Sequence, residues 1–182
     1  MEFLSSGRVF DQSDKEVPSG EIGEVVVRGP NIMPGYWNKP EPTAAVLRHG
    51  WYHSGDLGYL NDQGYLFLVD RANDMIISSG ENVYSTEVEE VLYQHPAVLE
   101  AAVFGVPDAK WGEAVHAVVV PRPGHAVDAA MLIAFCRGQI ADYKVPKQID
   151  LRGDPLPKSG PGKVLKRELR APFWAGHTAQ IH

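Results

Sequence analysis

The pattern of this sequence changes at a short polar stretch, residues 70–74 (DRAND), which lies between two apolar, strand-like runs. Before this stretch the chain alternates between strand-like runs and turns, and after it strand-like runs alternate with helix-like ones. A short polar link of this kind is typical of a boundary between domains. We therefore predict an α+β protein in which a small β-rich part, residues 1–72, is joined by a hinge to a small α+β part, residues 73–182.

The first part contains a strong hairpin signal. Residues 56–60 and 65–69 are strand-like, and the residues between them, NDQG, are the Asn, Asp and Gly that tight turns prefer. A further β-branched run covers residues 24–28, and residues 42–49 fit one or two helical turns. We therefore predict that this part consists mainly of β-structure.

The second part alternates between strands and helices. Thr86 and Glu89 have the spacing of a capping box, which predicts a helix that ends before Pro96. Asp128 is placed to cap a second helix, and a basic helix is predicted over residues 163–170. The predicted strands are residues 74–78, 98–106 and 114–120.

Composition excludes several classes of protein. The chain has 17 basic and 23 acidic residues, and the resulting net charge of −6 excludes a generally basic nucleic-acid binder. The single cysteine, Cys136, excludes an internal disulfide framework and a Cys-rich zinc site, and its apolar helix face favours a place in the core. Because no apolar run is long enough to span a membrane and no signal pattern is present, we expect a cytoplasmic protein.

Two charged residues are candidates for binding a nucleotide. Asp56 follows Gly55, and an ionised carboxylate can accept two hydrogen bonds from a diol such as a ribose. Arg71 is a rigid cation that suits ribose or phosphate oxygens. The residues alone leave two alternatives open: a simple turn at Gly55 and Asp56 that leads into the hairpin, and a solvated link around Arg71.

Two loops of small residues are further candidates. Ser79 and Gly80 let a ligand pass close to the backbone, although a tight turn before a helix is the alternative. Lys163 follows a loop rich in Pro, Gly and Ser at a predicted helix start, where a swinging lysine can act on phosphate and carboxylate oxygens. The alternative is a solvated basic helix. A P-loop is excluded because Val164 stands where Ser or Thr is required, and the spacing of the histidines predicts no metal site.

In their order and spacing, these stretches resemble the AMP-forming acyl-CoA synthetases of the adenylate-forming superfamily. The resemblance covers roughly residues 20–170. Its most specific runs are SGDLG at 54–58, SGENVY at 79–84 and PGKVLKR at 161–167. Further matching stretches are GEIGEVVVRGPNIMPGYWNKPE, VFGVPDAKWGE and YKVPK.

This resemblance implies two half-reactions. A carboxylate first attacks ATP to give an acyl-adenylate and pyrophosphate, and the thiol of coenzyme A then displaces AMP. On this basis Asp56 would bind the ribose hydroxyls, and Arg71 would bind the ribose or a phosphate. Lys163 would be the catalytic lysine of adenylation, because a placed cation lowers the repulsion between two anionic reactants. The implied cofactors are ATP, Mg²⁺ and coenzyme A, with no metal ligand expected in this chain.

The resemblance also implies that the second domain rotates about a hinge between the two steps. Asn73 stands at the hinge position, where family members often have Asp or Lys. Ser79, Gly80 and Glu81 would line the path of the pantetheine thiol, with Ser79 in place of a frequent glycine. The residues expected near the nucleotide of coenzyme A are Trp111, Lys144 and Lys147.

The sequence departs from the family by what it lacks. The Ser/Thr/Gly-rich phosphate loop, the Tyr/Thr/Glu motif that contacts adenine and Mg²⁺, and the acyl pocket would all lie upstream. The chain therefore resembles the C-terminal third of a synthetase. Residues 1–72 would be the last β subdomain of the large N-terminal domain, and residues 73–182 the lid domain. Because one wall of the cleft would be missing, we expect the chain alone to have little adenylation activity.

The expected function is the C-terminal part of an enzyme that activates a carboxylic acid and transfers it to coenzyme A. A fatty acid is the first choice of substrate, and an aryl acid is the alternative. A non-catalytic lid that binds coenzyme A or docks on a partner synthetase is a second alternative. The expected partners are the acid, coenzyme A and the missing N-terminal domain; we expect no nucleic acid and no transmembrane segment, and peripheral membrane contact stays open.

Overall fold

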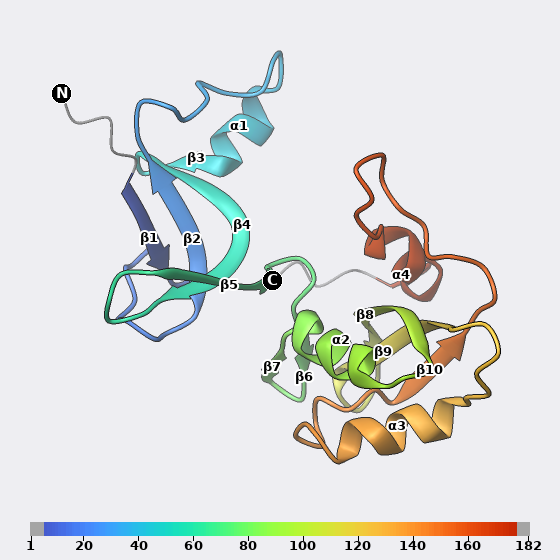
Figure 1. The fold of residues 1–182 in the computed structure, drawn as a ribbon. Coiled ribbons are helices and arrows are strands. Elements are labelled where there is room, and N and C mark those ends of the chain that lie inside the picture. Colours follow the sequence, from blue (N-terminus) through green and yellow to red (C-terminus); the bar gives the residue numbers. More distant parts are fainter. Residues whose placement is uncertain (1–5, 178–182) are drawn as a thin grey trace. The chain divides into compact units, whose positions relative to one another are not determined.

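The computed structural model describes residues 6–177 and has an α+β fold (Figure 1). The chain divides into two compact units, Met1–Asn73 and Asp74–His182. Each unit contains a five-stranded sheet within the described residues. The α+β prediction is confirmed, whereas the assignment of the first unit to the end of a larger domain stays a prediction. Among residues 6–177, no helix has the length and apolar character needed to cross a bilayer.

The described part of the first unit, residues 6–73, is an antiparallel sheet with one short helix, α1 (Pro40–Val46). Strands β1, β2, β4 and β3 are adjacent in that order, and β5 pairs with β4. The strands are β1 (Ser6–Phe10), β2 (Gly23–Arg28), β3 (Leu47–Arg48), β4 (Trp51–Leu60) and β5 (Leu66–Arg71).

The predicted hairpin is formed by β4 and β5. Its turn is built as the sequence indicated, because Asn61 Oδ1 accepts hydrogen bonds from the backbone N–H groups of Gln63 (3.1 Å) and Tyr65 (2.9 Å). One expectation is wrong: Asp70 and Arg71 belong to β5 and not to a polar link. They pair across the ladder with β4, which extends the strand to the end of the unit.

The second unit combines a mixed sheet with three helices among its described residues. Strands β10, β9, β6 and β7 are adjacent in that order, β8 pairs with β9, and β10 runs parallel to β9. The strands are β6 (Ile76–Ser78), β7 (Glu81–Val83), β8 (Val98–Asp108), β9 (Gly112–Pro121) and β10 (Gln148–Leu151). The helices are α2 (Ser85–Gln94), α3 (Ala129–Arg137) and α4 (Lys166–Trp174).

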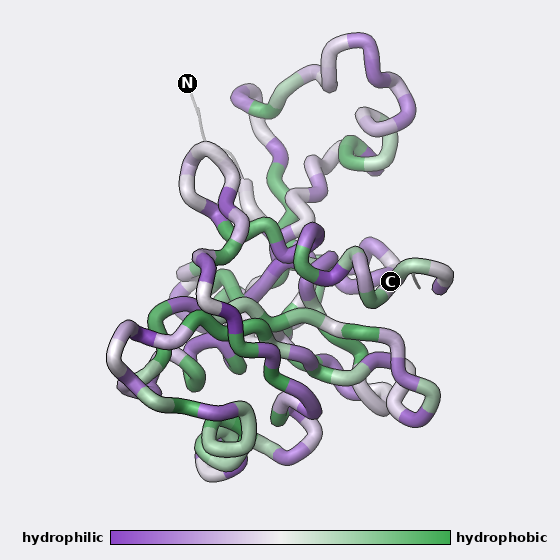
Figure 2. Tube along the Cα trace, turned by 90° about the vertical axis from the view of Figure 1, so that its right-hand side faces the viewer, coloured by the Kyte–Doolittle hydropathy of each residue, from purple (hydrophilic) through white to green (hydrophobic). Residues whose placement is uncertain are grey.

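The core of the second unit lies on both faces of the β8–β9 pair. One face packs on α2 and α3 through residues such as Val103, Leu92 and Leu132. The other packs through Phe104 and Leu156 on the segment that leads into α4. Both faces of these strands are therefore apolar, and the hydrophobic trace in Figure 2 runs through this unit between hydrophilic loops. A strand pair buried on two sides provides a rigid frame for the loops attached to it.

The helix caps confirm one prediction and correct another. Asp128 caps α3 by accepting a hydrogen bond from the Met131 N–H at 2.8 Å, and Cys136 on that helix is fully buried, which raises its thiol pKa to about 11. The capping box at Thr86 is wrong, because α2 begins at Ser85 and its cap has no side-chain hydrogen bond. Glu89 instead accepts a hydrogen bond from the Val103 N–H at 2.7 Å.

The last helix begins later than predicted. Helix α4 starts at Lys166, because Val164 forms an isolated β-bridge with Lys158 and the Leu165 N–H donates to the Pro157 carbonyl at 2.8 Å. These bonds keep residues 163–165 extended. Lys163 therefore lies on a short hairpin before the helix and not at its start.

His116 is a buried ionisable group whose pKa is shifted by its surroundings. Its side chain is 1% exposed, its Nε2 lies 3.1 Å from Asp150 Oδ2, and the Phe104 and Phe173 rings pack against it. Burial lowers the His116 pKa, and Asp150 only partly opposes that effect. The folded protein therefore favours neutral His116.

We predict that acid destabilises this unit partly through His116. Because the folded pKa lies below the unfolded value, the unfolding free energy falls as the pH drops through the ordinary range of histidine. Urea unfolding at about pH 7.5 and about pH 5.5 should show a larger loss for the wild type than for His116→Phe, which keeps the aromatic packing. Equal losses in the two proteins would show that His116 has no part in the acid sensitivity.

Candidate functional site

The two residues predicted to bind a nucleotide lie side by side in the first unit. Asp56 on β4 and Arg71 on β5 are cross-strand partners, and Arg71 Nε lies 3.5 Å from Asp56 Oδ1. Their side chains are 38% and 56% exposed, so both are open to a ligand. A carboxylate with free acceptor sites beside a guanidinium fits a ribose diol next to a phosphate.

The backbone before Asp56 is held by side chains from β2 and β4. Gly55 has a φ of +74°, and its N–H donates to Glu24 Oε1 at 3.1 Å. The Asp56 N–H donates to Ser54 Oγ at 3.1 Å, and that hydroxyl donates to the Val25 carbonyl at 2.7 Å. The positive φ favours a residue without a Cβ, which explains the glycine at this point.

A charged cluster that the sequence analysis missed supports this turn. His53 is buried, its Nδ1 lies 2.7 Å from Glu24 Oε2, and its Nε2 has no hydrogen-bond partner within residues 6–177. Arg48 binds Asp14, which lowers the Asp14 pKa and raises that of Arg48. The sequence signal was weak: an acid and a histidine inside strand-like runs.

The β6–β7 hairpin holds the residues predicted to line a thiol path. Ser79 and Gly80 form its turn with φ angles of +57° and +82°, and Glu81 follows as the first residue of β7. The Ser79 N–H donates to the Trp111 carbonyl at 2.8 Å, which ties this turn to the turn that precedes β9. All three hairpin residues are exposed.

Trp111 gathers two lysines beside this hairpin. Lys110 Nζ lies 4.2 Å and Lys147 Nζ 5.3 Å from the centre of the indole ring. Lys147 also donates to the Asp142 carbonyl at 3.1 Å. The structure therefore brings Trp111 and Lys147 together with Ser79, and Lys110 is an addition that the sequence analysis did not select. An aromatic ring with two cations suits an anionic ligand that carries a flat base.

Lys144 contacts an acidic residue of α2 and not the Trp111 ring. Its Nζ is 2.7 Å from both carboxylate oxygens of Glu87, and the side chain is 19% exposed. Burial acts to lower the Lys144 pKa, but the ion pair with Glu87 outweighs it, and the pKa is raised. This lysine is occupied by a partner on α2.

Lys163 is presented by a tight hairpin. Gly162 has a φ of +89°, the Ser159 N–H donates to the Lys163 carbonyl at 2.8 Å, and the Lys163 N–H donates to Ser159 Oγ at 3.2 Å. Its side chain is exposed and forms no ion pair with any residue that the structure describes. Asn73, the predicted hinge residue, is exposed and ends the first unit.

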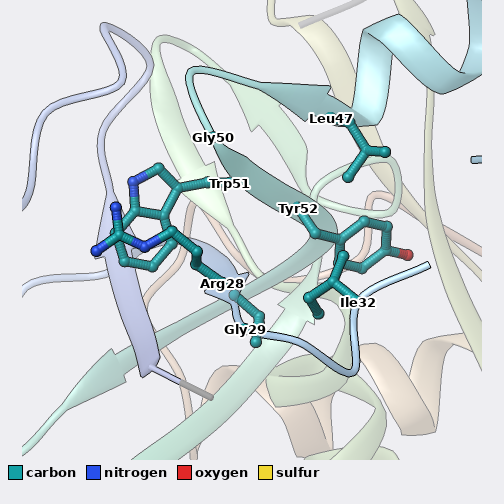
Figure 3. A pocket seen from close by; sticks show the side chains of 8 residues that line it. Arg28, Gly29, Ile32, Leu47, Gly50, Trp51 and Tyr52 are labelled. Atoms are coloured by element: carbon teal, nitrogen blue, oxygen red, sulfur yellow. The ribbon is translucent and has the colours of Figure 1, made fainter. Parts of the chain in front are cut away.

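One hollow in the first unit does not coincide with a predicted site. Figure 3 shows Arg28 against Trp51, with the guanidinium carbon 4.5 Å from the ring centre, and Leu47, Ile32 and Tyr52 on the other side. Its volume of about 190 Å³ is below the usual range of small-molecule pockets. Within residues 6–177 no group of three or more His, Cys, Asp or Glu side chains is placed to hold a metal ion.

Comparison with known proteins matches this chain to one family. Residues 87–163 match the AMP-binding enzyme C-terminal domain. Among curated proteins, a feruloyl-CoA synthase from Amycolatopsis is 52% identical over 171 residues, which are 94% of this chain and 35% of that protein. A long-chain-fatty-acid–CoA ligase from Bacillus subtilis is 51% identical over 149 residues, which are 82% of this chain and 26% of that protein.

A solved structure of another protein has the same fold as this chain. ATP-bound MatB from Rhodopseudomonas palustris superposes with a TM-score of 0.88 at 40% identity and covers 96% of this chain and 35% of its own. The chain thus spans 26% to 35% of the length of these curated relatives.

The backbone of the β6–β7 turn gives a testable prediction. Gly80→Ala places a Cβ on a left-handed residue and should lower the unfolding free energy by about 1–2 kcal/mol. The space around the new Cβ is open, so the cost is one of backbone conformation. Gly160→Ala is the matched control, because Gly160 has open space and no positive φ, and it should stay within about 0.5 kcal/mol of the wild type. Equal effects on urea unfolding would contradict this account.

Proposed function

Residues 87–163 of this chain form an AMP-binding enzyme C-terminal domain, and from that premise we propose that the chain is the C-terminal part of an ATP-dependent, AMP-forming acid–CoA ligase. In the first step a carboxylate oxygen bonds to the α-phosphorus of ATP and pyrophosphate leaves. In the second step the thiolate of coenzyme A bonds to the acyl carbon and AMP leaves. The observation that carries this proposal is the 52% identity over 94% of the chain to a feruloyl-CoA synthase.

The Asp56–Arg71 pair supports the first step. Asp56 has acceptor capacity for both ribose hydroxyls, and Arg71 is close enough to bind the same ribose or an adjoining phosphate. The donor set suits a nucleoside phosphate and offers no magnesium site by itself. We therefore assign Mg²⁺ and most contacts to ATP to the rest of the enzyme.

Lys163 has the chemistry required of a catalytic cation. Adenylation brings a carboxylate to a triphosphate, and a positioned ammonium stabilises the negative charge that gathers between them. The Lys163 side chain is exposed on an ordered hairpin. Asn73 ends the first unit and would be the hinge about which the second unit turns to deliver or withdraw this amine.

We assign the second step to the β6–β7 hairpin. Ser79, Gly80 and Glu81 would line the path of the pantetheine thiol, and Trp111 with Lys147 would receive the nucleotide end of coenzyme A. Lys144 would lie near the same nucleotide, where its ion pair with Glu87 on α2 holds the side chain.

The class of carboxylic acid substrate is a further part of the proposal. A fatty acid fits the long-chain-fatty-acid–CoA ligases among the relatives, and an aryl acid fits the feruloyl-CoA synthase. The identities of 51% and 52% favour neither acid, so the proposal is a carboxylic acid with these two classes as candidates. The remaining partner would be the N-terminal part of the ligase, without which we expect this chain to give little or no pyrophosphate exchange.

A chimera tests this function. We would join this chain to the N-terminal two thirds of the Amycolatopsis feruloyl-CoA synthase, with ferulate, ATP and coenzyme A as substrates. Thioester formation is expected from the chimera and not from either part alone. Asp56→Asn should lower kcat/KM for ATP by about 10- to 100-fold, because one charged acceptor of the ribose is lost.

The matched control is Asp62→Ala, which removes an exposed carboxylate from the β4–β5 turn and should leave the rates unchanged. A folded chimera that forms no thioester would argue for a non-catalytic lid. An Asp56→Asn variant with unchanged kinetics would remove the ribose-binding role.

A further inference from the structure

The hairpin that carries Lys163 is fixed by a lysine–glutamate pair at each end. Before the turn, Lys158 pairs with Glu100 on β8, and the other oxygen of Glu100 accepts the Leu156 N–H at 2.8 Å. After the turn, Lys166 pairs with Glu89 on α2. The segment is therefore tied to the frame on both sides, although its composition of Pro, Gly and Ser suggested a flexible loop.

The second pair is the more buried of the two. Lys166 Nζ lies 2.7 Å from Glu89 Oε1 and donates to Ser85 Oγ at 2.7 Å. The Lys166 and Glu89 side chains are 13% and 16% exposed, and Ser85 is fully buried. By contrast, Lys158 is 40% exposed. Removing the charge of Lys166 alone would leave the Glu89 carboxylate largely buried and without its cation.

The position of Lys166 is unfavourable for the helix that contains it. It is the first residue of α4, where the positive end of the helix dipole repels a cation. Desolvating two charges also costs free energy that their attraction only partly returns. Local stability therefore does not explain a lysine here. The best-attested role of a buried ion pair is to select one conformation among several, and here it would fix the position of the segment.

The partner of Lys166 is itself held in place. Glu89 Oε1 also accepts the Val103 N–H from the middle of β8 at 2.7 Å. A continuous chain of contacts thus runs from β8 through Glu89 to Lys166, three residues beyond Lys163. Because Val164 and Leu165 are fixed by their own backbone bonds, the position of Lys166 sets where the hairpin presents the catalytic amine.

We propose that Lys166 is a positioning residue, which with Glu89 and Ser85 holds the hairpin of Lys163 at one place on the β8–α2 frame. This inference rests on the proposed function of Lys163. It predicts that losing the ion pair loosens the hairpin while leaving the sheet intact.

Amide hydrogen exchange in the intact 182-residue chain tests the proposal without reference to activity. In Lys166→Met, the amides of Ser159 and Gly162, which are bonded across the hairpin, should exchange about tenfold faster, while those of β9 change by less than about twofold. Lys166→Arg should restore slow exchange because it keeps the charge. Arg167→Met is the matched control, since it removes an exposed charge from the same helix and should leave all rates unchanged.

Glu89→Gln covers the case in which Lys166→Met does not fold, because the amide oxygen can still accept the Val103 N–H while the charge is lost. The same local increase in hairpin exchange is expected. Unchanged hairpin exchange in the folded variants would overturn the proposal. So would an equal increase in the hairpin and in β9, which would make the pair a general stabiliser.

Activity of the chimera adds a readout for function. Lys166→Met should lower kcat for adenylation by about tenfold or more with little change in KM for ATP, and Lys166→Arg should rescue it. Loosened exchange with unchanged adenylation would mean that Lys163 is not the catalytic cation, so the failure of the proposed function is distinguishable from the failure of the positioning role.

Discussion

The long pairing of β8 with β9 is the interaction on which the second unit depends. Its two faces are both buried, one under α2 and α3 and the other under the segment that ends in α4. The candidate functional segments are attached to this pair: Ser79 through the Trp111 carbonyl next to β9, and Lys163 through the bonds of Glu89 and Glu100 to its neighbours. A rigid, doubly covered strand pair can thus hold two exposed hairpins with few contacts of their own.

Local chemistry made much of the fold predictable from the sequence. The β4–β5 turn follows from Asn61 and Gly64, the cap of α3 from Asp128, and the β8 and β9 strands from their apolar runs. Asp56 and Arg71 become cross-strand partners because their two strands flank one short turn and pair as a hairpin. These features depend on residues close together in the chain, which is why short patterns were sufficient.

The errors arose where distant residues decide. The start of α4 is delayed by bonds between residues 157–158 and 164–165 together with packing on the core, so a helical pattern from 163 was misleading. Thr86 matched a capping box, but α2 begins one residue earlier, and Glu89 serves Val103 and Lys166. The ion pair of Lys144 with Glu87 on α2 was likewise not foreseen, and the place of Lys144 near the nucleotide of coenzyme A stays a prediction. Val103 and Lys166 lie outside the local window around Glu89, and the core on which α4 packs lies outside the window around Lys163.

The most direct test of the account separates the two half-reactions in the chimera. If Lys163 acts as the cation of adenylation, Lys163→Ala should slow pyrophosphate release by about 100-fold or more, as for removal of a preorganised stabilising group. Thioester formation from a preformed acyl-adenylate and coenzyme A should stay within about threefold of the wild type. Equal slowing of both steps, or an unchanged adenylation rate, would contradict the central claim.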